Sequence, residues 1–155
     1  MNYDLLVRQL RDLAAEERWY VPLLSNAAAL LYDALPDLNW AGFYLMRDGA
    51  LVLGPFQGKV ACIRIAPGKG VCGAAVQQDH TQLVPDVHQF PGHIACDSAS
   101  NSEIVIPLHQ GGRVIGVLDI DSPKLARFDE ADRAGLEAFA RVLEEVMDLS
   151  PLSED

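Results

Sequence analysis

The fold is decided by two apolar runs, Glu103-Ile104-Val105-Ile106 and Val114-Ile115-Gly116-Val117-Leu118-Asp119-Ile120, which flank the turn Gln110-Gly111-Gly112. A glycine pair between two runs rich in β-branched residues is typical of an antiparallel hairpin. Because few polar side chains interrupt either run, we expect both strands to lie near the centre of a sheet.

Around this hairpin the sequence predicts one α+β domain, with helices packed on one face of an antiparallel sheet and a ligand pocket under loops on the other. Apolar spacing predicts helices from Asn2 to about Glu17, from a cap at Ser25 or Asn26 to Pro36, from Val71 to about Gln77, and from Asp129 to about Met147. Further strands are expected at Asn39 to Met46, Leu51 to Leu53, Val60 to Ile65 and Gln82 to Val84, with Asp48-Gly49 as a second hairpin turn.

The length of 155 residues suits a single domain. We assign residues 1–149 to this domain and residues 150–155 to a flexible tail. The odd count of three cysteines, with no apolar leader after Met1, predicts a reducing, cytoplasmic compartment in which any disulfide is transient and catalytic. A net charge of −10 disfavours nucleic acid and anionic membranes as partners, and no apolar run approaches the roughly 18 residues of a membrane span.

One thiol, Cys96, lies in the polar loop from Pro91 to Asn101. A run this rich in Gly, Ser, Asn and Asp does not form a core, so we expect solvent or a small ligand to reach Cys96. Cys62 and Cys72 lie upstream on segments that can fold back toward it. The chemistry is therefore expected at this loop.

The strand period of two places Asp119 and Asp121 on one face, and Glu103 opens the neighbouring strand of the same hairpin. Three carboxyls that converge raise one another's pKa, which leaves one of them protonated near neutral pH as an acid. The alternative is a solvated or turn-capping Asp at the strand end, and it fits Asp121 better than Asp119. Trp40 and Tyr44 also share a strand face, where core packing is the commoner role of such a pair.

Two other motifs are weaker. Gly68 to Gly73 matches the dinucleotide fingerprint Gly-x-Gly-x-x-Gly, but no parallel βαβ unit is expected to follow it. A turn that places Cys72 at a helix start is sufficient to explain the glycines, and such a position can lower the pKa of a thiol that reaches the helix-end amides. A zinc site would use Cys62, Cys72, His93 and Cys96, whose spacings fit no common structural site, so we predict no metal. The remaining histidines, His80, His88 and His109, are expected on the surface or in loops.

Four blocks of the sequence resemble the free methionine-(R)-sulfoxide reductases, enzymes built from a single GAF domain. The blocks are Gly70-Val71-Cys72-Gly73, Val84-Pro85-Asp86-Val87-His88, Phe90 to Val105 with its Pro91-Gly92-His93-Ile94-Ala95-Cys96-Asp97-Ser98 core, and Gly116-Val117-Leu118-Asp119-Ile120-Asp121-Ser122. The likeness spans nearly the whole chain and includes the spacing of the three cysteines.

The resemblance implies a role for each residue grouped above, with no cofactor. It makes Cys96 the nucleophile, Cys62 and Cys72 the resolving thiols, Trp40 and Tyr44 the walls of the pocket, and Glu103, Asp119 and Asp121 the ligands of the substrate's polar groups. On this hypothesis Cys96 attacks free methionine sulfoxide while Glu103 or Asp121 donates a proton, and a disulfide to Cys62 or Cys72 is then reduced by thioredoxin or a similar dithiol.

The competing hypothesis is a GAF sensor module that binds a small ligand, or is oxidised at Cys96, without turnover. A sensor is oxidised once, whereas an enzyme consumes substrate for as long as reductant lasts. The sequence does not choose between a monomer and a homodimer.

Overall fold

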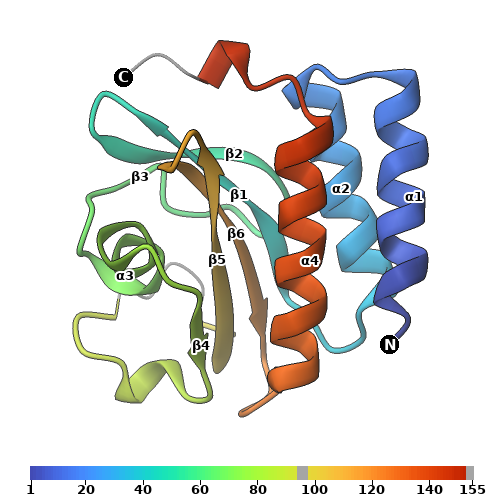
Figure 1. Ribbon diagram of the computed structural model, residues 1–155. Helices are drawn as coiled ribbons and strands as arrows, with labels where there is room; N and C mark the ends of the chain where they lie inside the picture. Colours follow the sequence, from blue (N-terminus) through green and yellow to red (C-terminus); the bar gives the residue numbers. More distant parts are fainter. Residues whose placement is uncertain (94–97, 153–155) are drawn as a thin grey trace.

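The computed structural model describes residues 1–93 and 98–152, and Figure 1 shows them as a sheet between two unequal layers. The helices are α1 (Tyr3–Glu16), α2 (Tyr20–Ala34), α3 (Gly70–Gln78) and α4 (Glu130–Val146), with short 3-10 turns η1 (Val87–Gln89) and η2 (Ser150–Leu152). The strands are β1 (Trp40–Arg47), β2 (Ala50–Gly58), β3 (Arg64–Ile65), β4 (Gln82–Val84), β5 (Ser102–Gln110) and β6 (Arg113–Ser122).

The six strands form one sheet in the order β3-β2-β1-β6-β5-β4, and all of its described pairings are antiparallel. Strands β5 and β6 make the predicted hairpin, and β6 also pairs with β1, so β6 has a neighbour on both sides. The expected α+β class and the central position of the hairpin are therefore confirmed.

Three helices cover one face of the sheet. Helix α2 lies on β1 and β2, α4 lies on β5, and α1 packs outside them against α4 and α2 (Figure 1). Alternate strand residues such as Phe43, Leu118 and Ile120 point into this layer and are fully buried with the helices' own apolar stripes. At the start of α4, Asp129 and Asp132 form a capping box that satisfies free backbone N–H groups.

The other face is covered by α3 and the chain that follows it, as the predicted long loop implied (Figure 1). The glycines at 68–73 serve a tight turn at the start of α3. Gly68 and Gly70 have φ angles of +84° and +62°, and a Cβ on Gly73 would lie 2.6 Å from the carbonyl oxygen of Ala66. The fingerprint-like spacing thus has a steric cause, and the described sheet contains no parallel pair that a dinucleotide fold would need.

Three predicted boundaries were wrong, two of them in α2 and β2. Helix α2 begins at Tyr20 rather than after Ser25, with Pro22 inside its first turn, where the backbone N–H that proline lacks has no intrahelical partner anyway. The strand expected at Leu51 to Leu53 is longer, because β2 continues through Gly54 and Pro55 to Gly58, with a register shift on β1 between Gly42 and Tyr44.

The strand expected from Val60 to Ile65 is reduced to Arg64–Ile65, and residues 59–63 form a loop at the sheet edge. At the other end of the chain, Ser150–Leu152 forms η2, while residues 153–155 lie outside the described part, so a flexible tail stays a prediction. None of the helices in residues 1–93 and 98–152 combines the length and the apolar character needed to cross a bilayer.

Candidate active site

The predicted carboxyls lie on the pocket face of the sheet because of strand register. Across β1, β6 and β5, Trp40 pairs with Asp121 and Asp121 with Glu103, which aligns the three residues in one row. In the next row on the same face, Gly42 pairs with Asp119. Glycine is required at this position, because a Cβ on Gly42 would lie 2.3 Å from Cβ of Phe56 and 2.9 Å from Cη2 of Trp40.

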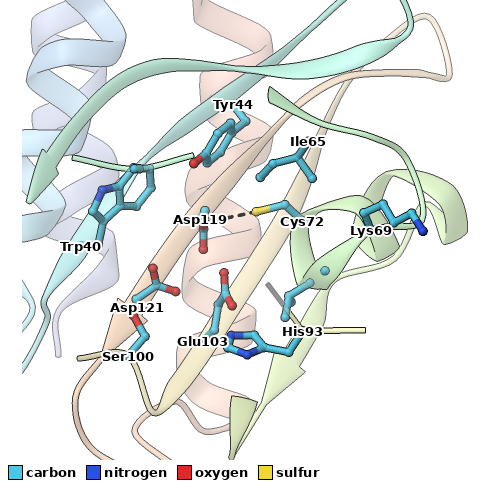
Figure 2. A pocket seen from close by; sticks show the side chains of 13 residues that line it. Trp40, Tyr44, Ile65, Lys69, Cys72, His93, Ser100, Glu103, Asp119 and Asp121 are labelled. Carbon is cyan, nitrogen blue, oxygen red and sulfur yellow. Dashed lines mark hydrogen bonds between the residues drawn. The ribbon is translucent and has the colours of Figure 1, made fainter. Parts of the chain in front are cut away.

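A pocket with an internal volume of about 40 Å³ lies over these rows. Figure 2 shows Glu103, Asp119 and Asp121 gathered between the rings of Trp40 and Tyr44 and the thiol of Cys72. Strands β1, β5 and β6 supply the aromatic and acidic walls, and α3 supplies Cys72. The remaining lining residues are Ala61, Ile65, Lys69, Gly70, Val71, His93 and Ser100.

The aromatic wall is a stack. The rings of Trp40 and Tyr44 lie 5.8 Å apart with planes 23° from parallel, and Phe56 stacks on the other side of Trp40 at 5.2 Å. The polar ends of both wall residues are bound to one loop, because Trp40 Nε1 donates to the carbonyl oxygen of Lys59 (3.1 Å) and Tyr44 Oη donates to that of Cys62 (3.0 Å). Both residues are 2% exposed, so the aromatic wall is almost completely buried.

Burial controls the protonation of the acidic wall. It raises the pKa of Glu103 well above its usual value, and the neighbouring carboxyls of Asp119 and Asp121 add to the effect. Burial also raises the pKa of Asp119, although interactions with Glu103, Cys72 and Asp121 oppose that increase. The environment therefore favours the protonated form of Glu103 more strongly than that of Asp119, which suits Glu103 to the role of an acid.

Cys72 lies in the first turn of α3, as expected, but the helix end does not activate it. Its Sγ donates to Asp119 Oδ2 over 3.2 Å, and burial together with the charge of Asp119 raises the pKa of the thiol well above its usual value. Tyr44 is shifted in the same direction, since burial and the charge of Asp119 raise the pKa of its hydroxyl. Cys72 is thus a protonated donor within the pocket and a poor nucleophile.

Of the two other cysteines, Cys62 belongs to the described part of the chain and Cys96 does not. Cys62 is half-buried in the loop that Trp40 and Tyr44 fix, and it is disulfide-bonded, whereas Cys72 is free. Cys96, the predicted nucleophile, falls in residues 94–97 and lies outside the described residues. The structure therefore brings Trp40, Tyr44, Cys72, Glu103, Asp119 and Asp121 to one pocket, and Cys62 is joined to it through the hydrogen bond from Tyr44 to its carbonyl oxygen.

The donor atoms of Cys72, Glu103 and Asp119 lie within 4.8 Å of one another, which is close enough for a metal ion. However, the pKa values of all three groups are raised, and a metal would have to displace their protons. The zinc set considered from the sequence is disfavoured more strongly, because the disulfide of Cys62 removes one thiolate ligand.

Sequence reasoning missed four residues around the pocket. Phe56 extends the aromatic stack, and Ile65, Lys69 and Ser100 line the cavity. The side chain of Ser100 accepts a hydrogen bond from Asn39 Nδ2 (3.0 Å), which links the loop before β5 to the start of β1. The only signal for Lys69 and Ser100 was their position next to the motifs that hold Cys72 and Glu103.

The fold and its pocket define a GAF domain, and the GAF domain family matches residues 23–148. The free methionine-R-sulfoxide reductase of Escherichia coli is 54% identical over 145 residues, which cover 94% of this chain and 88% of that protein. Among solved structures, fRMsr of Staphylococcus aureus in complex with substrate has a TM-score of 0.90 at 50% identity and covers 95% of this chain and 96% of its own. The free methionine-R-sulfoxide reductase of Neisseria meningitidis in complex with its substrate has a TM-score of 0.91 at 45% identity, and the match covers 98% of this chain and 92% of that one.

The chain therefore belongs to the GAF-domain family of free methionine-R-sulfoxide reductases. This membership confirms the resemblance seen in the sequence motifs.

Proposed function

We propose that the protein reduces free L-methionine (R)-sulfoxide to L-methionine through Cys96, with thioredoxin or a similar dithiol as the electron donor. What supports the proposal is the combination of a buried carboxyl with a raised pKa, Glu103, and a disulfide-bonded cysteine, Cys62, whose carbonyl oxygen is bound by the pocket residue Tyr44. Reduction of a sulfoxide needs both a proton donor for its oxygen and a thiol pair that can be oxidised.

In the proposed first step, the Cys96 thiolate attacks the sulfoxide sulfur while Glu103 protonates the sulfoxide oxygen. The oxygen is transferred to Cys96, which becomes a sulfenic acid, and methionine leaves with a lone pair restored on its sulfur. Glu103 is favoured over Asp121 as the acid because its pKa is raised well above the usual value by burial and by two neighbouring carboxyls.

In the second step, a resolving thiol displaces water from the sulfenic acid and forms a disulfide. We assign this role to Cys62, since Cys62 is disulfide-bonded and Cys72 remains free, buried and protonated. Thioredoxin then restores both thiols by exchange, a cycle suited to a reducing, cytoplasmic compartment.

Substrate selection follows from the two walls of the pocket. Trp40 and Tyr44 offer an apolar surface to the methyl sulfoxide end, and Asp119 and Asp121 offer negative charge to the ammonium of a free amino acid. A peptide-bound methionine lacks that ammonium, and its chain would have to leave a pocket lined on several sides.

The test is NADPH consumption with thioredoxin and thioredoxin reductase, using the free R and S epimers in parallel. We expect continuous turnover of the R epimer alone, and no turnover by Cys96→Ser at an unchanged melting temperature. If reduced protein consumed one equivalent of either epimer and then stopped while reductant remained, the non-catalytic GAF sensor would replace the enzyme.

A further inference from the structure

The loop around Cys62 carries an unusual pair of side chains. Val60 is 87% exposed and Ile63 is 71% exposed, the highest fractions among the large apolar residues that the structure describes. Single exposed apolar residues are common on protein surfaces and need no explanation. Here, however, the two residues stand on either side of a half-buried, disulfide-bonded cysteine.

The backbone of this loop is held in place. Its carbonyl oxygens at Lys59, Cys62 and Ile63 accept hydrogen bonds from Trp40 Nε1 (3.1 Å), Tyr44 Oη (3.0 Å) and the backbone N–H of Leu53 (2.9 Å). Because the carbonyls are bound to the pocket wall and the sheet, Val60 and Ile63 are left to solvent on an ordered scaffold. An ordered surface loses little conformational entropy when a partner binds to it.

The ends of the loop are cationic in an acidic protein. Lys59 and Arg64 are both exposed, and neither makes an ion pair with any residue in the described part of the chain. The whole chain has a net charge of −10, so these two side chains form a local exception. A partner with an acidic rim around an apolar centre would be complementary to the loop.

We propose that Lys59 to Arg64 is the docking surface for the protein dithiol that regenerates the enzyme. The partner presents an apolar face with acidic residues around its attacking thiol. This apolar face contacts Val60 and Ile63, on either side of Cys62. The proposal rests on the proposed function, since only a redox cycle requires a partner at this disulfide.

The chemistry at the docked loop balances. One thiolate of the partner attacks Sγ of Cys62, the existing disulfide breaks, and the thiolate of the cysteine bonded to Cys62 leaves and takes up a proton. The second thiol of the partner then attacks the sulfur of the partner's first cysteine in the mixed disulfide, which forms the partner's disulfide and releases the Cys62 thiolate to take up a proton. The partner ends as a disulfide, and its two electrons and two protons reduce and protonate the two cysteines of the enzyme.

The test compares a protein reductant with a small one. For the double variant Val60→Ser/Ile63→Ser we expect the KM for thioredoxin to rise about tenfold, because two apolar contacts are lost. Turnover supported by dithiothreitol, which needs no docking surface, should stay unchanged. The matched control is Leu5→Ser/Val21→Ser, which removes two exposed apolar side chains from α1 and α2 on the opposite layer.

Two further measurements sharpen the test. Lys59→Glu/Arg64→Glu should raise the KM for thioredoxin at low salt, with the difference shrinking as ionic strength rises. A thioredoxin that lacks its second cysteine should be trapped in a mixed disulfide that peptide mapping places on Cys62.

An unchanged KM for thioredoxin in the Val60→Ser/Ile63→Ser variant, or an adduct that excludes Cys62, would overturn the docking surface while leaving the enzyme intact. A wild-type protein that turns over with neither reductant would instead overturn the proposed function, and the docking surface with it.

Discussion

Strand β6 presents two opposite faces from one backbone. Leu118 and Ile120 point toward the helices and are fully buried, while Asp119 and Asp121 point into the pocket and are nearly as buried, at 5% and 9% exposure. Burial of the first pair stabilises the fold, whereas burial of the second disfavours the charged form that a carboxyl adopts in water. The comparison shows that burial on the helix-covered face supplies stability, and that part of this stability offsets the cost of burying carboxyls on the pocket face.

The largest effect should come from the helix-covered face. Phe139 of α4 is fully buried, and Phe139→Ala should lower the free energy of unfolding by about 3–5 kcal/mol in urea titrations, because it leaves a cavity in the larger core. The kcat of the fraction that remains folded should stay close to that of the wild type. A large loss of kcat without loss of stability would contradict the division between the faces.

On the pocket face, a substitution should reduce turnover rather than stability. Glu103→Gln removes the acid and keeps the shape of the side chain, so kcat should fall about 10²- to 10⁴-fold in the thioredoxin-coupled assay, while the melting temperature at neutral pH does not fall. The matched control is Glu130→Gln, an exposed carboxyl at the start of α4. If only the melting temperature of Glu103→Gln changed, the carboxyl would be structural.

A smaller effect is expected in the pH dependence of the free energy of unfolding, again through Glu103. The folded pKa of Glu103 is raised above the unfolded value of about 4.3, so its stabilising contribution is complete below that pH and is lost as pH rises toward the folded pKa. In urea titrations above about pH 4.3, the wild type should lose stability relative to Glu103→Gln, by at most about 1.4 kcal/mol per pH unit for one group.

Asp119 and Cys72 have raised pKa values as well, so the Glu103→Gln variant should keep part of the slope. Parallel curves for the two proteins across this range would show that Glu103 titrates in the folded state as it does in the unfolded chain.

The smallest effect is expected at Cys72. In Cys72→Ser the hydroxyl can still donate to Asp119, and the resolving role belongs to Cys62, so kcat should stay within about a factor of three, less than 1 kcal/mol in the barrier. Mass spectrometry should find the same oxidised disulfide as in the wild type. Loss of turnover comparable to Cys96→Ser would make Cys72 an obligatory relay.

Much of the fold was predictable because two periodicities are clear in the sequence. The period of two in residues 103–121 predicted both the central hairpin and the face that carries the acids, and the apolar stripe after Asp129 predicted α4. The start of α2 was missed because its N-cap, Trp19, has no capping side chain, so the usual polar signal is absent. The sequence predicts that this strand ends at Leu53, but β2 runs through Pro55, which is tolerated because β2 pairs with β3 only at Leu51 and Val52.

The sequence predicted which residues form the site, but it predicted their chemical states only in part. Register explains why Trp40, Asp121 and Glu103 meet, and the period of two was sufficient to group them. The protonation of Cys72 could not be predicted, because it depends on contact with Asp119 across the pocket rather than on the start of α3. Nor could the loop at residues 59–63 be foreseen, since side chains from β1 bind the carbonyls that a strand partner would otherwise have used.

The position of Trp40 gives the protein an optical reporter. The chain has two tryptophans, and they differ sharply in environment: Trp19 is 52% exposed, whereas Trp40 is 2% exposed and stacked between Tyr44 and Phe56. Exposed indoles emit at longer wavelengths than buried ones, so the two signals separate. With Trp19→Phe, the remaining fluorescence would come from the pocket wall alone, and ligand binding and thiol oxidation could be followed in real time without a label.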